Sequence, residues 1–315
     1  MDKKQSQAND HTLDPRGLLH LAVVYLVWSS TYLAIRLAVR EGAGFPPFTL
    51  GFMRALPAGI LLLTWGFLQK GSIRLNRREL LILAGSGMLL WLGGNGLVTF
   101  AEQRADSGLA ALMVAGTPIW VAIIEALIDR KLPSLQIFIA LLIGFGGIGV
   151  LTAPSLMTGI RADVVAIVAL LGAEICWGLG SVLQARKSVR SNPRVSAGYQ
   201  MLFGAIGFFL VARLLNEPAP TPTPEAWGAW LYLVLVGSVI AFASYVTVLR
   251  LLPTRIVMTY AYVNPVLAVV LGWLWLGEAI TGWTLAGSAL VLLGVAGVFR
   301  ERNTKARPVE TTKAE

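Results

Sequence analysis

The chain has 315 residues, of which 56% are hydrophobic and only 14% are charged, and its mean hydropathy is +0.68. A soluble globular domain carries about a quarter charged residues, so this composition excludes an ordinary soluble enzyme or binding domain. The net charge of +9 is concentrated in the loops on one side of the predicted spans, which argues against a nucleic-acid-binding surface.

Apolar stretches long enough to cross a membrane recur along the whole chain. A helix needs about 20 apolar residues to span about 30 Å of hydrocarbon. The stretches are continuous and do not alternate, which favours helices over the strands of an outer-membrane barrel. We therefore predict an all-α membrane protein. Its ten transmembrane helices cover residues 17–39, 46–69, 79–100, 106–129, 134–153, 163–186, 195–215, 228–249, 255–277 and 281–300.

Basic residues predict the orientation of these helices. With the N-terminus inside, the inner loops and tails hold 20 Lys and Arg residues, whereas the outer loops hold five. Positive charge accumulates on the cytoplasmic side, so both termini, residues 1–16 and 301–315, are predicted to be cytoplasmic tails. The polar start, MDKKQSQANDHTLDPRG, lacks the pattern of a cleaved signal peptide. We expect a multi-pass protein of a bacterial inner membrane.

The two halves of the chain resemble each other. Each half, 17–153 and 163–300, has five predicted spans, with a proline in the fourth, Pro118 or Pro265. A glycine of the fifth span, Gly146 or Gly294, follows these prolines by 28 and 29 residues. Because five is odd, the halves must enter the membrane in opposite orientations, as in alternating-access transporters. Gene duplication without transport is the alternative explanation.

The repeated prolines and glycines each have a functional and a packing interpretation. Pro118 and Pro265 remove a backbone hydrogen bond, so they predict kinks that could gate a cavity, although kinks also occur in ordinary bundles. The glycine clusters in 85–96 and 144–149 are better explained by close helix packing than by binding.

The second half, with YVNPVLAVVLGWLWLGEAITGWTLAGSALVLLGVAG, resembles an EamA module of the drug/metabolite transporter superfamily. The shared pattern is a proline in the ninth span, an LGE turn and a glycine-spaced last span. The first half resembles a more divergent copy, with DRKLPS in place of the turn. Within the superfamily the chain resembles YddG-type exporters of aromatic and other amino acids. The resemblance implies a central cavity lined by spans one to four and six to nine, but it does not decide the cargo.

Spans one and six carry matching polar and aromatic stripes. At an offset of 149 residues, VVYLVWSSTYLAIR aligns with GAEICWGLGSVLQA. Residues spaced i, i+3, i+4 and i+7 share one helix face, and aliphatic residues occupy the other faces. Each stripe should therefore face inward. The two stripes are Tyr25, Trp28, Ser29 and Tyr32, and Glu174, Trp177, Gly178 and Ser181.

Other residues at mid-depth extend this predicted cavity. Tryptophans usually lie near the membrane interface, but Trp28, Trp177, Trp91 and Trp120 lie deep in their spans. Aromatic walls suit an apolar, planar or cationic cargo, whereas packing between helices is the alternative role. The remaining candidates for substrate contact are Asn95, Tyr245 and Tyr262.

Two charged residues inside spans are candidates for function. Arg54 lies in span two and Glu174 in span six. Charged side chains in a membrane are costly and usually functional. They could pair with each other; alternatively Arg54 could hold a substrate carboxylate while Glu174 attracts an ammonium group or carries a proton. The alternative is a purely structural role for both, as a pair or hydrogen-bonded groups that fix helix packing.

These observations favour a secondary transporter over an enzyme. The sequence has one cysteine, Cys176, and two histidines near the N-terminus, so no catalytic or metal cluster is expected and no cofactor is predicted. No GxxxxGK[ST] motif occurs, so we expect a gradient or exchange to drive transport, without an ATP-binding subunit. The predicted cargo is a small amphipathic metabolite such as an amino acid, exported by a monomer in the lipid bilayer. Efflux of drugs or toxic cations, or sugar-phosphate transport, are the alternatives.

Overall fold

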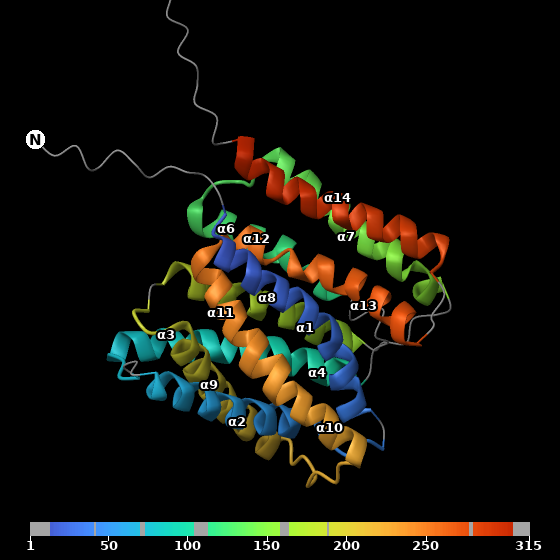
Figure 1. The fold of residues 1–315 in the computed structure, drawn as a ribbon. Coiled ribbons are helices and arrows are strands. Elements are labelled where there is room, and N and C mark those ends of the chain that lie inside the picture. The colour runs from blue at the N-terminus through green and yellow to red at the C-terminus, as the bar shows by residue number, and fades with distance from the viewer. Residues whose placement is uncertain are drawn as a thin grey trace, which may run out of the picture.

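The computed structural model describes residues 13–40, 42–69, 73–103, 113–157, 164–187, 189–276 and 280–304, and every regular element in these ranges is a helix (Figure 1). The helices of the first half are α1 (Pro15–Val39), α2 (Pro47–Leu68), α3 (Arg77–Gly87), η1 (Met88–Gly96), α4 (Leu97–Ala101), α6 (Thr117–Asp129) and α7 (Leu135–Met157). Those of the second half are α8 (Val164–Arg186), α9 (Pro193–Leu214), α10 (Pro224–Tyr232), η2 (Leu233–Ile240), α11 (Ala241–Leu251), α12 (Thr254–Val257), α13 (Tyr260–Leu276) and α14 (Gly282–Thr304).

Several helices begin at sequence signals that satisfy their first backbone N–H groups. Asp14, Asn192 and Thr223 are N-caps whose side chains accept a backbone hydrogen bond, and a proline follows within the first turn of α1, α9 and α10. Asn76 and Glu79 form a capping box at the start of α3. Proline suits the first turn of a helix because the missing N–H has no partner there.

Eight helices of the described ranges are long and apolar enough to cross a membrane. The predicted fourth and ninth spans differ from this pattern. The fourth was expected as one helix over 106–129, but α6 begins only at Thr117 after a turn at 115–116, and residues 104–112 lie outside the described ranges. The sequence had suggested that Pro118 kinks a continuous helix. In the structure Pro118 lies in the first turn of α6 instead.

The ninth span is also interrupted. The expected helix over 255–277 is divided into α12 and α13 by a turn at Met258 and Thr259. In this turn the backbone hydrogen bonds join residues three apart, such as Ala261 N to Met258 O at 3.1 Å. Pro265, inside α13, has no N–H to donate to the carbonyl of Ala261, so one backbone hydrogen bond is missing just after this turn.

The third and eighth spans contain π-helical segments that the sequence pattern did not predict. In the third span η1 separates α3 from α4, and in the eighth η2 separates α10 from α11. A π-helical turn widens the helix and changes the direction in which side chains project, and such turns often occur at functional sites. Both segments contribute residues to the same internal cavity, described below.

Contacts between helix ends define two ends of the bundle. At one end, which we call the basic end, the start of α9 contacts the end of α2, and the end of α8 contacts the end of α6. The start of α3 and the end of α11 lie there too. At the opposite end, Arg40 after α1 pairs with Glu225 at the start of α10. Glu217, which follows α9, accepts hydrogen bonds from Phe48 N and Thr49 N at the start of α2. Consequently α2 and α9 run in opposite directions, and so do α6 and α12.

Helices α7 and α14 pack side by side along one edge of the bundle (Figure 1). Their glycines let the two backbones touch. A methyl group added at Gly294 would lie 2.6 Å from the backbone of Gly144, and one at Gly287 would lie 2.6 Å from the backbone of Leu151. The packing role predicted for the cluster in 144–149 thus holds at Gly144 and Gly147, whereas a methyl group at Gly146 or Gly149 would meet no atom within 4 Å. Large apolar side chains such as Leu292 are exposed on the outside, as lipid contact requires.

Replacing Gly294 with Ala should destabilise the protein. The added methyl group meets backbone that cannot rotate away, and overpacking of this kind costs about 1–3 kcal/mol. Gly149→Ala in α7 is the matched control, because no atom lies within 4 Å of a methyl group placed there. Thermal unfolding in detergent should show a lower midpoint for Gly294→Ala and an unchanged or higher one for Gly149→Ala; equal midpoints would contradict the packing assignment.

Candidate functional site

A buried cavity of about 70 Å³ lies where the two halves of the bundle meet. Its wall is formed by both π-helical segments together with α1, α2, α4, α6, α8, α11 and α13. A water molecule occupies about 10–15 Å³ on this measure, so the cavity has room for several waters or a small ligand. Its residues come from spans one to four, six, eight and nine.

Tryptophan and tyrosine rings form one wall of the cavity. The rings of Trp28 and Trp177 meet edge to face with centroids 5.5 Å apart. Tyr260 contacts Trp28 at 5.1 Å, and Tyr245 contacts both tryptophans, at 5.0 and 5.4 Å. The indole N–H of Trp28 donates to the carbonyl of Gly237 in η2 at 3.3 Å. The stripes of α1 and α8 therefore pack against each other at the cavity, where aromatic faces can stack on a planar or cationic group.

Arg54 supplies the positive charge of the cavity. It is 6% exposed, although it lies in the middle of α2. Its Nε donates to Ser238 Oγ at 2.8 Å, its Nη1 lies 3.5 Å from Asn95 Oδ1, and the guanidinium lies 5.2 Å from the ring centre of Trp91. All of these partners are neutral. The guanidinium thus keeps donor capacity for an anionic ligand, and the buried Nε1 of Trp91 has no hydrogen-bond partner within the described part of the chain.

Glu174 supplies the opposite charge, and it is held by a different element. It lies in the middle of α8, is 3% exposed, and forms a hydrogen bond with the hydroxyl of Thr117 at the start of α6. The ion pair with Arg54 that the sequence suggested is not found among the described contacts. Each group is held by neutral side chains of another helix instead, although both line the same cavity.

The structure brings half of the predicted substrate-contacting residues to the cavity wall. These are Trp28, Arg54, Trp91, Asn95, Glu174 and Trp177. Tyr245 and Ser181 lie directly behind the tryptophans. Their hydroxyls are hydrogen-bonded at 2.5 Å, and both residues are fully buried. They support the wall without lining it.

The other predicted site residues lie elsewhere. The Tyr25 hydroxyl is hydrogen-bonded to Thr259 at 2.5 Å in the turn between α12 and α13. Tyr262 donates to the carbonyl of Leu141 in α7 at 3.0 Å, so its role is to join helices. Trp120 is half-buried on α6 and is not among the cavity-lining residues. The side chain of Tyr32 lies outside the described residues.

Sequence reasoning missed several cavity residues. Thr117 and Ser238 hold the two charged groups, and Tyr260 completes the aromatic wall. Thr117 directly precedes Pro118, a position where a hydroxyl can replace a lost backbone donor, and this signal was available in the sequence. Ser238 could not be found by helical periodicity, because it lies in a π-helical segment.

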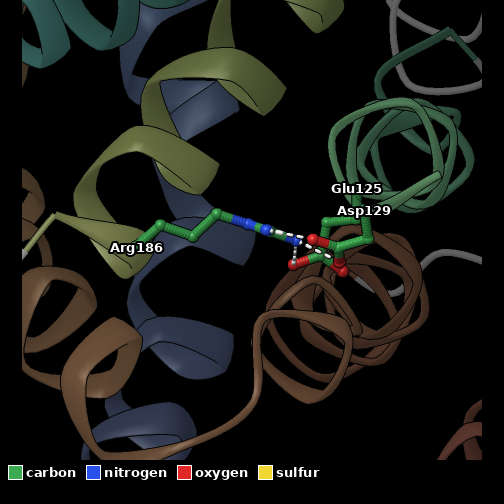
Figure 2. Close-up of polar contacts among 3 residues, drawn as sticks. All are labelled: Glu125, Asp129 and Arg186. Carbon is green, nitrogen blue, oxygen red and sulfur yellow. Dashed lines mark hydrogen bonds and ion pairs between the residues drawn. The ribbon is translucent and has the colours of Figure 1, made fainter. Parts of the chain in front are cut away.

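A second cavity, of about 160 Å³, lies at the basic end between α6 and α7. Beside it Arg186, at the end of α8, reaches across to α6 (Figure 2). Its guanidinium binds both carboxylate oxygens of Asp129, at 2.5 and 2.6 Å, and lies 3.8 Å from Glu125 Oε1. This ion pair between Arg186 and Asp129 joins the first half of the chain to the second at the basic end. Within the described ranges, no group of three or more His, Cys, Asp or Glu residues is placed to hold a metal ion.

The apolar spans and the enclosed cavity with opposite charges define a multi-pass integral membrane protein with a site for a small solute. Comparison with known proteins agrees with this class. The model of the EamA-like transporter family matches residues 15–153 and again residues 164–300. The chain belongs to the EamA-like transporter family. It is therefore a membrane transporter and not an enzyme, and the two matches indicate an internal repeat.

Similar proteins occur in distant bacteria. The chain is 34% identical over 278 residues to the "Uncharacterized inner membrane transporter YedA" of Escherichia coli K12, covering 87% of this chain and 86% of that protein. It is 23% identical to the "Uncharacterized transporter YoaV" of Bacillus subtilis, covering 88% and 94%. A solved crystal structure shares the fold with a TM-score of 0.75 at 23% identity, covering 92% of this chain and 98% of that one.

Replacing Arg54 with Met should leave the protein at least as stable as the wild type. A buried charge that is balanced only by neutral groups gives little net stability, and an apolar residue of similar length often stabilises such a site. Arg250→Met is the comparison: Arg250 also has neutral partners, but it joins the end of α11 to the start of α9 by two short hydrogen bonds, at 2.5 Å to Ser191 O and 2.6 Å to Ser196 Oγ, and its loss leaves a backbone carbonyl without this donor, so the midpoint should fall. Thermal midpoints in detergent would measure both; a large loss in Arg54→Met would assign Arg54 to the scaffold.

Proposed function

We propose that this transporter moves small amphipathic metabolites, amino acids among them, out of the cell by alternating access through the central cavity. The observation that carries the proposal is the presence of Arg54 and Glu174 in one cavity, where each is held by neutral partners and both share a wall with Trp28 and Trp177. An α-amino acid has the complementary chemistry: a carboxylate, an ammonium group and an apolar side chain.

The arrangement of donors and acceptors supports a defined orientation of this ligand. The carboxylate would bind at Arg54, where the unpartnered indole N–H of Trp91 offers a further donor. The ammonium group would bind near Glu174, and the side chain would lie against the tryptophans. Because Arg54 is the one cation among the described residues that line the cavity, the double negative charge of a sugar phosphate is less well matched.

We infer that the two halves, 17–153 and 163–300, are inverted five-helix repeats with both termini in the cytoplasm. Helices of the two halves that correspond in order, such as α2 and α9, run in opposite directions. Basic residues in helix ends and loops gather where α8 ends and α9 begins, and such residues favour the cytoplasmic side. The printed name of the Escherichia coli relative refers to the inner membrane, which agrees with the predicted membrane and leaves the orientation to the basic residues.

In this orientation the structure corresponds to a state that is closed toward the cytoplasm. The cavity extends toward the opposite end of the bundle, because Ile35 in the last turns of α1 and Val114, just before α6, are part of its wall. Toward the basic end the tryptophans and Tyr245 fill the space between the helices. Below them Arg186 joins α8 to α6 (Figure 2). Release of these contacts would open the cavity to the cytoplasm.

Transport is tested with purified protein in liposomes, using counterflow of labelled phenylalanine, leucine, lysine and glutamate together with a quaternary ammonium dye. We expect counterflow of a neutral amino acid, and a reduction of about two- to tenfold in Trp177→Phe or Trp28→Phe, because each change removes part of an aromatic contact. Trp283→Phe, on an exposed ring, is the control. Inert wild-type vesicles would refute the proposal, and transport of the dye alone would favour cation efflux.

Breaking the Arg186–Asp129 contact should open the cytoplasmic side without unfolding the protein. The ion pair is partly exposed to solvent, and exposed pairs contribute little to stability. With Cys176 replaced by Ser and Val98 in the cavity wall replaced by Cys, inside-out vesicles would be treated with a membrane-impermeant maleimide. We expect several-fold faster labelling after Asp129→Asn, and reversal by the exchanged pair Arg186→Asp with Asp129→Arg. Equal rates in all variants would contradict a gating role.

A further inference from the structure

The break in the fourth span leaves a carbonyl group that needs a donor. In a continuous helix the N–H of residue 118 would bond to the carbonyl of Val114, but Pro118 has no N–H. The hydroxyl of Thr117 replaces it, with Thr117 Oγ1 2.7 Å from Val114 O. Val114 and Thr117 are both buried, where an unpaired carbonyl is unfavourable.

The same hydroxyl oxygen is also hydrogen-bonded to Glu174. A threonine hydroxyl has one hydrogen to donate. If it donates to Val114, the bond with Glu174 can form only when the carboxyl carries a proton and donates it to Thr117. If Glu174 is ionised, it can only accept, so the Thr117 hydrogen must turn toward the carboxylate and Val114 loses its donor. The two protonation states of Glu174 are therefore compatible with two different arrangements at the start of α6.

We propose, on the basis of the transport function above, that Glu174 is the proton-binding site that couples substrate movement to a proton gradient. We also propose that Thr117 transmits its protonation state to the break at Pro118. Glu174 lines the cavity, so its proton can pass to cavity water when a substrate ammonium group approaches. Proton and ammonium compete for one carboxyl, and this competition makes the exchange an antiport of one proton against one substrate molecule. Helix α6, which responds, also carries Glu125 and Asp129 at the basic end.

Among the described residues around Glu174, no second carboxylate lies at the same depth and could bind the coupling proton in its place. The described titratable and charged groups of the elements that pack around α8 or share its cavity are Arg16, His20, Tyr25, Arg36, Arg54, Arg77, Arg78, Glu79, Glu102, Glu125, Asp129, Cys176, Arg186, Tyr245, Arg250, Arg255, Tyr260 and Tyr262. Glu102 lies at the end of α4 near the opposite end of the bundle, whereas Glu79, Glu125 and Asp129 lie toward the basic end.

The second half of the chain has a related contact next to its proline, without a carboxyl group. Asn264 directly precedes Pro265, as Thr117 precedes Pro118. In the amide orientation that satisfies its neighbours, Asn264 donates to Tyr260 O at 3.1 Å and to Tyr25 O at 3.2 Å. Tyr25 is the residue that aligns with Glu174 between the two stripes. Each broken span is thus tied to the stripe of the other half, and Glu174 is the carboxyl member of this pair of contacts.

Coupling is measured in liposomes with the membrane potential held at zero by potassium and valinomycin. The probe is labelled phenylalanine, or the amino acid with the largest counterflow in the panel above. With the interior more acidic by about one pH unit, one-to-one antiport should accumulate the probe inside about tenfold. Glu174→Gln should reduce this ratio to about one, because the amide can donate to Thr117 but releases no proton. Glu225→Gln, which removes a carboxyl outside the cavity, should behave like the wild type.

Thr117 is tested as a positioning residue by its effect on coupling. Thr117→Val removes the hydroxyl with little change in shape and should lower the accumulation ratio, whereas Thr117→Ser keeps the hydroxyl and should preserve it. A measurement without substrate complements this test: the infrared carboxylic-acid C=O absorption of the purified protein should lose one component, the Glu174 band, in Glu174→Gln. The band should shift in Thr117→Val and stay in place in Thr117→Ser.

The outcomes separate the coupling from the transport function. Wild-type transport that ignores the pH gradient, or accumulation on the alkaline side, would overturn the antiport coupling and leave amino-acid transport standing. Absence of all transport would refute the proposed function, and the infrared band would then still decide whether Glu174 holds a proton. A carboxylic-acid band that persists unchanged in Glu174→Gln would overturn the proton site itself.

Discussion

The constraint on which the rest of this structure depends is the backbone hydrogen bond that a proline cannot make inside a membrane. Each half of the chain has a proline and a broken helix in its fourth span, where water cannot supply a missing donor. In the first half the Thr117 hydroxyl supplies it to Val114, and in the second half the side chain of Asn264, next to Pro265, donates to the carbonyl of Tyr260. Both side chains also contact the first span of the other half, through Glu174 and through the backbone of Tyr25. The breaks are therefore where the two halves are joined, and the cavity lies beside one of them.

Two buried ionisable groups share this cavity without pairing with each other. Arg54 is held by Ser238 and Asn95 over the face of Trp91, and Glu174 is held by Thr117. An arrangement built for stability would pair such charges or replace them with apolar side chains. A transport site has the opposite requirement, because groups that satisfy each other completely offer nothing to a substrate. The neutral partners fix the positions of the charges and leave their electrostatic attraction available to a ligand.

Rigid and movable contacts are separated in the bundle. At one edge α7 and α14 meet backbone to backbone through glycines, a contact that tolerates no sliding (Figure 1). Around the cavity the contacts are aromatic edges, single hydroxyl hydrogen bonds and, at the basic end, the exposed fork between Arg186 and Asp129 (Figure 2). Such contacts can break and re-form at small cost in free energy. The π-helical segments η1 and η2 carry cavity residues from both halves.

Hydropathy, loop charge and the repeated proline were enough to identify a helical membrane protein with two related halves. Lipid requires every span to be apolar and to satisfy its own backbone hydrogen bonds, so each span is visible in the sequence. Helical periodicity also identified the stripe residues Trp28, Glu174 and Trp177, since spacing on a regular helix decides which residues share a face. Only the tertiary structure decided the partners of the charges. Ser238 and Asn95 lie in π-helical segments that break this periodicity, and Thr117 meets Glu174 across 57 positions of sequence. Arg54 and Glu174 do not pair with each other because side chains of other helices, Ser238 and Asn95 for Arg54 and Thr117 for Glu174, bind each of them.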